Sequence, residues 1–371
     1  PLNLAFMNGT TTGEDVFIPL DWIIGGVDYA GKGWRMLVEC LSAGRGISLP
    51  AISTAGGHLA SKMTSAYASV RHQFGLPIAK FEGIQESMAR IGGHTYALEA
   101  MRKFTVTAID LGMSPSVITA IAKYHMTEYN RQIVNDAMDI HAGKGIQLGP
   151  KNYLGNGYVG LPIAITVEGA NILTRNLMIF GQGATRCHPY VLDEMTVVGQ
   201  EDEETAIREF DKLLVSHILF AISNGAGALF QGLTGAVFNK KPLAGETSGY
   251  YQQLSRLSRG FALCSDIAMM VLGGDLKRKE MLSARLGDVL SQLCIASAIL
   301  KHYEDEGRQV ADLPFVHYSV RQCLYEIGQA FSGFFENFPN RTFAWMMKIF
   351  VFPLGNHFKK PDDSIIQDVC K

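Results

Sequence analysis

The sequence has few charged residues and no surplus of either sign. Only 18% of its 371 residues are charged, 33 basic residues stand against 35 acidic ones, and the net charge is −2. A chain without a basic surplus lacks the electrostatic signature of a nucleic-acid-binding protein. Because hydrophobic residues make up 47% of the chain, the composition excludes a disordered protein. It favours a globular or membrane-adjacent protein of two or three domains.

Cysteine is scarce, and the cysteines are scattered. No two of the six form a C-x-x-C pair, and the ten histidines follow no zinc-binding spacing, so we predict no metal site. We interpret the cysteines as small core residues of a protein from a reducing compartment. Cys187 and His188 are adjacent, but neighbours rarely present both groups to one substrate, and we interpret them as structural.

Long apolar runs are also missing. No run reaches the roughly 20 residues of a membrane-spanning helix, and the closest, residues 343–354, contains Lys348 and Pro353. Residues 331–354 are rich in Phe, Trp and Met, which suits an internal packing helix or a helix lying on a membrane surface; we favour the first. The chain begins Pro-Leu-Asn-Leu, without features of a signal peptide, so we expect a fragment or a processed chain.

The pattern of apolar residues predicts a mainly α-helical protein. Residues 1–30 have strand character and indicate the end of a β domain. Within residues 31–198 the spacing is helical, and long helices joined by short breaks predict an antiparallel four-helix bundle. After a polar, acidic stretch, residues 199–371 predict a second all-helical domain. The expected helices of the bundle cover residues 34–48, 55–72, 81–112, a segment opening at Ser114 and Pro115, and 169–180.

Glycine and small residues are concentrated in two places. The helix expected over residues 55–72 is rich in Ala, Ser and Gly, which would let neighbouring helices pack closely. Residues 143–160 are dense in glycine, which indicates tight or positive-φ backbone or a closely approaching ligand. The GKG sequences at 31–33 and 143–145 complete neither a P-loop nor a dinucleotide-binding fingerprint.

Three charged residues each admit two interpretations. Arg71 ends a helix, where it is either a favourable cap, which the chemistry alone favours, or a clamp for a phosphate or pyrophosphate. Glu168 follows an apolar stretch and precedes a helix, so it is either a first-turn residue or a base strengthened by burial. Arg45 is either exposed to solvent or semi-buried against a carboxylate or polar group.

Seven short motifs, taken in order, resemble those of the acyl-CoA dehydrogenase family. Each is weak alone, and the ordered set is specific. The resemblance covers about residues 9–195 and implies the end of the family's middle β domain (1–30) and its C-terminal helical-bundle domain (31–198). Residues 199–371 resemble the helical extension of the bacterial long form of fatty acyl-CoA dehydrogenase. The motifs are EDVFIP (14–19), GKGW (31–34), RGI (45–47), RHQFGLPI (71–78), FEGIQ (81–85), DIHAGKGI (139–146) and VEG (167–169).

The resemblance implies an enzyme. Its reaction is the FAD-dependent α,β-dehydrogenation of a medium- or long-chain acyl-CoA to trans-2-enoyl-CoA, the first step of fatty acid β-oxidation. Glu168 matches the family's proton-abstracting base, and Gly44 stands where some members carry the base instead. The backbone N–H of Glu168 and a ribityl hydroxyl of FAD are the implied donors to the thioester oxygen.

The resemblance also implies binding residues. Arg71 and Gln73 would meet the FAD pyrophosphate across a dimer interface. Asp139, Ala170 and Ile172 stand where the family often has Gln, Thr and Gln. The implied cofactor-binding residues are Arg71, Gln73, Phe81, Glu82, Asp139, Ile140, His141, Ala142, Gly143, Ala170 and Ile172. The implied substrate-binding residues are Ser42, Ala43, Gly44, Arg45 and Gly169.

Partners and location follow from the same resemblance. It implies an acyl-CoA substrate, a homodimer, and an electron-transferring flavoprotein as electron acceptor, with no nucleic acid. We expect a cytoplasmic protein, with contact to the inner membrane as a compatible option. The alternative, from the residues alone, is a non-catalytic helical interaction module or a membrane-surface module.

Overall fold

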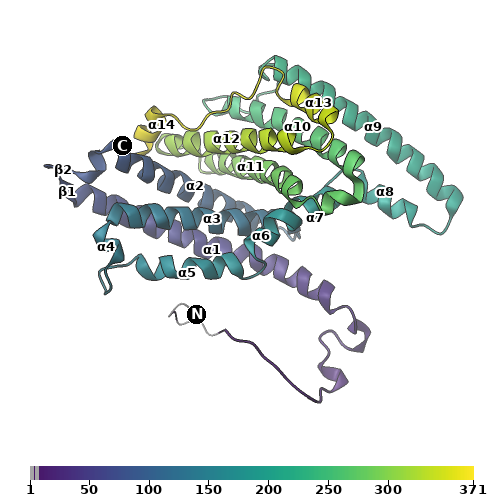
Figure 1. Cartoon of the computed structure of the whole chain (residues 1–371), viewed down its shortest axis with the longest axis horizontal. Helices are drawn as coiled ribbons and strands as arrows, with labels where there is room; N and C mark the ends of the chain where they lie inside the picture. Colours follow the sequence, from purple (N-terminus) through teal and green to yellow (C-terminus); the bar gives the residue numbers. More distant parts are fainter. Residues whose placement is uncertain (1–3, 5–7) are drawn as a thin grey trace.

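Helices account for nearly all regular structure in the computed structural model, which describes residues 4 and 8–371 (Figure 1). The predicted mainly α-helical fold class is confirmed. The first bundle consists of three long helices and a shorter one. Its helices are α1 (Gly33–Val70), α2 (Glu82–Asp110), α3 (Ser116–His141) and α5 (Gly155–Thr166), with the short α4 (Gly143–Ile146) between the last two. The predicted helix over 169–180 is divided into α6 (Asn171–Leu173), a π-helical stretch (Thr174–Ile179) and α7 (Phe180–Arg186).

Helix α1 is continuous, whereas the sequence predicted two helices. Pro50 lies inside it, where the missing N–H removes one hydrogen bond of the helix. The hydroxyl of Thr54 donates to the Pro50 carbonyl (2.8 Å), and α1 packs along α2 and α3. Packing along two neighbours therefore outweighs the local cost of the proline.

Close helix packing at glycines is confirmed. A Cβ atom at Gly56 would lie 2.5 Å from Asn130 Oδ1, and one at Gly46 would lie 2.5 Å from Thr119 Cγ2. Both partners are on α3, so α1 and α3 approach each other closely at these glycines.

The backbone of the glycine-dense stretch 143–160 was only partly predicted. Gly149 has a φ of 118°, but residues 155–160 are helical.

The predicted β character of residues 1–30 is wrong for the described part of that segment. Residues 8–32 contain two 3-10 turns (Leu20–Trp22 and Val27–Tyr29) and no strand. Val16, Phe17 and Ile18 are 60–85% exposed, because no strand in the described part of the chain pairs with them. Among the described residues the only sheet is the hairpin of β1 (His72–Gln73) and β2 (Leu76–Pro77), in which His72 pairs with Pro77.

The second half of the chain packs directly on the first. Helices α11 and α12 lie against α2, and α9 lies on the far side from α1 (Figure 1). One hydrophobic cluster includes Met101 of α2, Ile295 of α11 and Ile327 of α12, so the two halves share a core. The predicted boundary at 198/199 stays a prediction. The helices are α8 (Val191–Val198), α9 (Glu203–Leu233), α10 (Ser248–Leu272), α11 (Glu280–Asp305), α12 (Leu313–Asn337), α13 (Arg341–Val351) and α14 (Asp363–Val369).

The aromatic segment 331–354 is an internal packing element, as the sequence analysis favoured. Phe331, Phe334, Phe338 and Met347 are at most 1% exposed. The expectation that no segment suits a membrane-spanning helix is wrong. Helices α9, α10 with its following turn, and α11 are each long and apolar enough to cross a membrane, and the apolar window of α9 is only 11% buried.

Candidate active site

The candidate base Glu168 lies on the short connection between α5 and α6. Its φ is 54° and that of Gly169 is 95°, so the chain turns sharply through two left-handed residues. The Glu168 side chain is half-buried, and its Oε2 atom has no hydrogen-bond partner among the described residues. Its backbone N–H likewise donates to no backbone carbonyl in that part of the chain. An acceptor and a donor are therefore both available at one residue.

Arg45 of α1 is buried beside Glu168, so the semi-buried interpretation is the correct one. Only 5% of Arg45 is exposed. Burial lowers the pKa of its guanidinium, and the charge of Glu168 opposes that shift. One guanidinium nitrogen contacts Met178 Sδ at 3.6 Å, while Nε is buried without a partner among the described residues. The site thus holds a cation and a carboxylate that both keep unused polar atoms.

Sequence reasoning missed Lys123, which completes this site. The residue lies on α3 and is fully buried. Its ammonium group donates hydrogen bonds to the carbonyls of Ile165 and Gly169 and to Oδ1 of Asn171. Nearly every residue of α3 between 117 and 127 is buried. A helix with apolar residues on all its faces is expected to be buried, and this pattern around position 123 is the signal that could have predicted a buried lysine.

A mostly apolar cavity of about 390 Å³ lies between α1, α3 and α5. Ile52 and Leu59 line it from α1, Val134 from α3, and Leu161 and Ala164 from α5. Ala164 lies four residues before Glu168 on the same segment. The lining suits a hydrocarbon chain, and the segment that carries Glu168 contributes Ala164 to it.

The β1–β2 hairpin carries the residues implied in binding the pyrophosphate. Arg71 and Gln73 are exposed, and the backbone N–H of Arg71 closes α1 by donating to Tyr67 (2.8 Å). Arg71 is thus the helix-capping residue, and its side chain still faces solvent. Phe81 stacks edge-on with the exposed Phe74, and Glu82 accepts a 3.4 Å hydrogen bond from Gln367 of α14.

The turn from Asp139 to Gly143 splits into buried and exposed residues. Ile140 and His141 are buried, and the His141 ring stacks on Tyr67 with 4.3 Å between centroids. The His141 nitrogens bond to the Ala137 carbonyl and the Tyr153 hydroxyl. Only the backbone of Ile140 and His141 therefore remains for a ligand. Asp139, Ala142 and Gly143 are exposed, and Ala142 has a φ of 49°.

The remaining implied residues lie near Glu168. Gly44 is half-buried one residue before Arg45, and Gly169 is half-buried and accepts from Lys123. Ala170 is exposed and Ile172 is 77% exposed. The side chains of Ser42 and Ala43 lie outside the described ones. The structure thus gathers Gly44, Arg45, Glu168 and Gly169 at one site, and the hairpin and the 139–143 turn at another.

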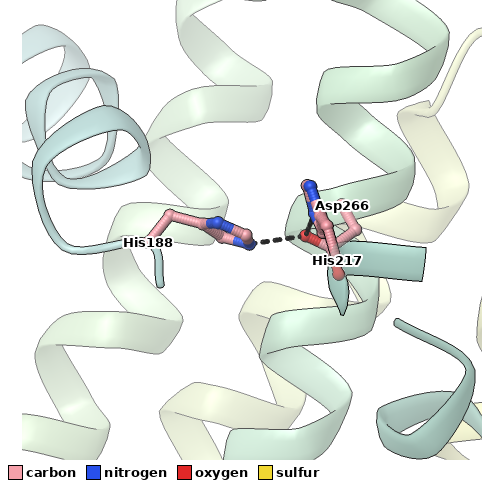
Figure 2. A group of neighbouring side chains, drawn as sticks. All are labelled: His188, His217 and Asp266. Carbon is pink, nitrogen blue, oxygen red and sulfur yellow. Dashed lines mark hydrogen bonds and ion pairs between the residues drawn. The ribbon is translucent and has the colours of Figure 1, made fainter. Parts of the chain in front are cut away.

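A second polar cluster joins three separate elements. Figure 2 shows His188, from the turn before α8, and His217 of α9 both directed at Asp266 of α10. His188 Nε2 lies 2.8 Å from Asp266 Oδ1, and His217 Nδ1 lies 2.8 Å from Glu194 Oε1. Their distant sequence positions form no motif, so the sequence analysis, which predicted no metal site, did not find this cluster.

The hydrogen bonds of this cluster fit an ion network better than a metal site. His188 Nδ1 accepts the backbone N–H groups of Tyr190 and Val191, so its proton lies on Nε2 and points at Asp266. His217 has a carboxylate at each nitrogen, Glu194 at 2.8 Å and Asp266 at 3.4 Å, so either ring nitrogen can donate its proton to a carboxylate. A metal bound at Asp266 would therefore have to displace the proton that His188 Nε2 directs at Asp266.

Two family models match the chain. Residues 31–179 match "Acyl-CoA dehydrogenase, C-terminal domain", and residues 185–371 match "Acyl-CoA dehydrogenase, C-terminal, bacterial type". One matched range ends at residue 179 and the other begins at residue 185. Together they cover both helical halves of the structure.

Individual relatives match over shorter stretches. The chain is 64% identical to protein HemX of Proteus mirabilis over 66 residues, which are 18% of this chain and 39% of that protein. It is 33% identical to acryloyl-CoA reductase (NADH) of Anaerotignum propionicum over 133 residues, which are 36% of this chain and 32% of that protein. The chain thus spans about a third of the length of these curated relatives.

Solved structures share the fold. An acyl-CoA dehydrogenase from Bacillus anthracis, complexed with FAD, superposes with a TM-score of 0.68 at 16% identity, over 92% of this chain and 56% of that chain. At this identity the similarity concerns the fold alone. Because one family model by itself matches half of the residues and a second matches most of the rest, the chain belongs to the acyl-CoA dehydrogenase family, of which it represents the C-terminal helical part.

Proposed function

We propose that this chain forms the base-bearing part of an FAD-dependent enzyme that converts a medium- or long-chain acyl-CoA to the trans-2-enoyl-CoA. The observation that supports this most strongly is the environment of Glu168. Its Oε2 atom is buried without a partner among the described residues, and the buried cation Arg45 is electrostatically coupled to it. A structural carboxylate in such a place would be expected to satisfy its oxygens.

Each group at this site has a role in the proposed reaction. Glu168 Oε2 takes the proton from the carbon next to the thioester, a general-base role that typically contributes about 10²- to 10⁴-fold. The backbone N–H of Glu168, which has no backbone acceptor among the described residues, donates to the thioester oxygen as negative charge develops there. The charge of Arg45 lies beside Glu168, and the apolar walls between α1, α3 and α5 exclude water from the acyl chain.

The residues present fit FAD at the hairpin end of the bundle. Arg71 and Gln73 are exposed donors, and no atom lies within 4 Å of a Cβ built at Gly143, so a pyrophosphate has cationic and amide donors and open backbone to approach. When bound, FAD supplies the hydride acceptor for the substrate. The chain's own contribution is to bind the cofactor and orient the substrate.

The placement of these groups favours a homodimer. The β1–β2 hairpin and α4 lie at one end of the bundle, and α6 lies toward the other (Figure 1). The hairpin of one copy would then contact the pyrophosphate of an FAD whose flavin ring lies at Glu168 of the second copy. By family resemblance, we propose an electron-transferring flavoprotein as the electron acceptor.

The test compares the full-length parent with its Glu168→Gln variant under anaerobic conditions. A saturated long-chain acyl-CoA is added, and bleaching of the visible flavin absorbance is followed. We expect the parent to bleach and Glu168→Gln to bind FAD but bleach at least about 10²-fold more slowly. The matched control is Glu86→Gln on α2, since Glu86 is exposed and lies outside both proposed binding sites.

Three other results would change the proposal. Equal bleaching rates would make Glu168 structural. A parent that does not bleach with acyl-CoA but is reoxidised by a 2-enoyl-CoA would place the enzyme with reductases, the activity named for one relative. A full-length parent without flavin would favour the non-catalytic interaction module.

We propose membrane contact through α9 as a second function, compatible with a cytoplasmic enzyme at the inner membrane. Residues 213–239 contain no Asp, Glu, Lys or Arg and are flanked by Lys212 and by Lys240 and Lys241. Val215, Ile218, Leu219 and Ile222 are 50–62% exposed. An exposed apolar face with lysines at its ends suits the interface of a bilayer.

Vesicle sedimentation tests this second proposal. We expect the chain to sediment with vesicles that contain phosphatidylglycerol and phosphatidylethanolamine, and the double variant Ile218→Asp/Ile222→Asp to stay in the supernatant. Val310→Asp is the control, because Val310 is 83% exposed but lies far along the chain in a separate loop. Equal sedimentation of all three proteins would contradict a role for α9.

A further inference from the structure

The most unusual buried group outside the proposed chemistry is the ammonium of Lys123. It donates hydrogen bonds of 3.1 Å to the Ile165 carbonyl, 2.7 Å to the Gly169 carbonyl and 2.6 Å to Asn171 Oδ1. These acceptors come three residues before Glu168, one residue after it and three residues after it. An ammonium has three donors, and all three are used on the two sides of Glu168.

The segment around Glu168 needs such an anchor. A non-glycine residue in the left-handed region costs of order 1–3 kcal/mol, and such a conformation persists only where the surroundings fix it. Glu168 has a φ of 54°, so its own backbone favours leaving the observed geometry. Ile165 lies in the last turn of α5, where a cation is also favoured by the helix dipole.

The charges around Lys123 are set by three neighbours. Arg45 comes from α1, Glu128 from the same helix, and Glu168 from the anchored segment. Burial and Arg45 lower the pKa of Lys123 to about 8, and the two carboxylates oppose the shift. The ammonium is therefore retained at neutral pH although its burial costs stability. Lys123 keeps its charge at this cost with no direct ion pair among the described residues, and its hydrogen bonds suit it to act as an anchor.

We propose that Lys123 is a positioning residue, whose three hydrogen bonds fix the backbone on both sides of Glu168 and so hold its carboxylate in the orientation that proton abstraction needs. This inference rests on the proposed function for its chemical consequence. The anchoring itself is independent of the cofactor. Lys123 acts through the segment that carries Glu168, because it donates to the carbonyls of Ile165 and Gly169 and to the amide oxygen of Asn171.

A supporting network fixes Asn171 in turn. The Asn171 side chain donates to Thr127 Oγ1 (3.0 Å) and to Glu128 Oε1 (2.7 Å). Both partners lie on α3 within five residues of Lys123. The start of α6 is thus tied to the same face of α3 as the end of α5, and the connection that carries Glu168 is held at both ends.

Two measurements on the Lys123→Met variant of the full-length protein test the proposal. Hydrogen exchange, followed by mass spectrometry, should show amides of residues 167–171 exchanging at least about tenfold faster than in the parent, with α2 unchanged. Anaerobic flavin bleaching at saturating acyl-CoA should slow by about 10- to 100-fold. The acyl-CoA concentration that gives half of the maximal bleaching rate should change less than about threefold. Lys62→Met is the control, since Lys62 is an exposed lysine on α1.

The outcomes separate this inference from the proposed function. Unchanged exchange in residues 167–171 overturns the anchoring, and faster exchange with unchanged bleaching overturns the role toward Glu168. If the parent shows no bleaching but the variant still exchanges faster, the anchoring stands and the proposed function fails. If Lys123→Met does not fold, Lys123→Gln, which keeps a polar group, replaces it. We then expect the same faster exchange and slower bleaching, with smaller changes in both rates.

Discussion

The ring of Tyr318 occupies the place that a side chain at position 93 would take. A Cβ atom built at Gly93 of α2 would lie 2.2 Å from Cδ1 of Tyr318 on α12. The neighbouring Ser319 hydroxyl donates to the Gly93 carbonyl (2.9 Å). The two family-matched halves of the chain therefore meet through direct contact between a glycine and an aromatic ring.

Substitution of Gly93 should loosen this contact. Gly93→Ala forces Tyr318 to move, and overpacking of this kind typically costs about 1–3 kcal/mol. Chemical denaturation should show a free energy of unfolding lower by that amount. The control is Gly83→Ala in the first turn of the same helix, where nothing lies within 4 Å of the added Cβ. Equal stability of the two variants would show that the halves do not depend on this contact.

The ion pair of Arg90 and Asp136 should contribute strongly to the stability of the first bundle. Arg90 Nε and a second guanidinium nitrogen donate to Asp136 at 2.7 and 2.8 Å, and this hydrogen bonding raises the pKa of Arg90. Asp136 is buried, so Arg90→Met leaves an uncompensated charge and should cost about 2–3 kcal/mol. Thermal and urea unfolding would measure the loss.

A matched surface pair provides the control for this prediction. Arg208 and Glu204 on α9 lie 3.8 Å apart with side chains that are 74% and 90% exposed. Arg208→Met should therefore change stability by less than about 0.5 kcal/mol. Similar losses of stability in both arginine variants would mean that the burial of Asp136 does not increase the contribution of its ion pair with Arg90.

Much of the helical pattern could be predicted from the sequence. The apolar spacing located α2 and α3 and predicted that the second half is helical, because each helix buries one face. The spacing failed at α1, where it predicted two helices, over 34–48 and 55–72, whereas packing along α2 and α3 keeps one helix with Pro50 inside it. It also failed near Val16 and Phe17, whose strand-like alternation has no pairing strand among the described residues.

The candidate site was predictable where it follows a contiguous motif. Arg45, Glu168 and Gly169 were found because short motifs mark them, and their binding roles stay predictions. Lys123 was missed because a lysine is usually exposed, and only its surroundings on α3 show otherwise. The His188, His217 and Asp266 cluster was missed because its members come from three elements and meet only in the folded chain.

Added zinc should not stabilise this cluster. His188 Nδ1 accepts backbone N–H groups, and His217 bridges Glu194 and Asp266, so a metal at Asp266 would have to displace the proton on His188 Nε2 and break this network. We expect Tm to shift by less than about 1 °C between a chelator and a micromolar excess of zinc. A rise of several degrees in the parent that is absent in Asp266→Asn would instead identify a metal site.

The buried ammonium of Lys123 should give the chain a distinctive pH dependence of stability. Its pKa is lowered from 10.5 to about 8, so between these values the unfolded state holds a proton that the folded state has lost. The free energy of unfolding therefore rises with pH in this range because of Lys123, and well below pH 8 the residue contributes no pH dependence. Relative to that of Lys123→Met, the free energy of unfolding of the parent should rise by roughly 2 kcal/mol between about pH 7 and 9.5.

Urea unfolding of both proteins at each pH measures this difference. The contributions of the other titratable groups cancel from it, because both proteins contain them. Lys62→Met should show no such trend, and a parent-to-variant difference that is constant or falls with pH would mean that the folded state keeps its proton on Lys123.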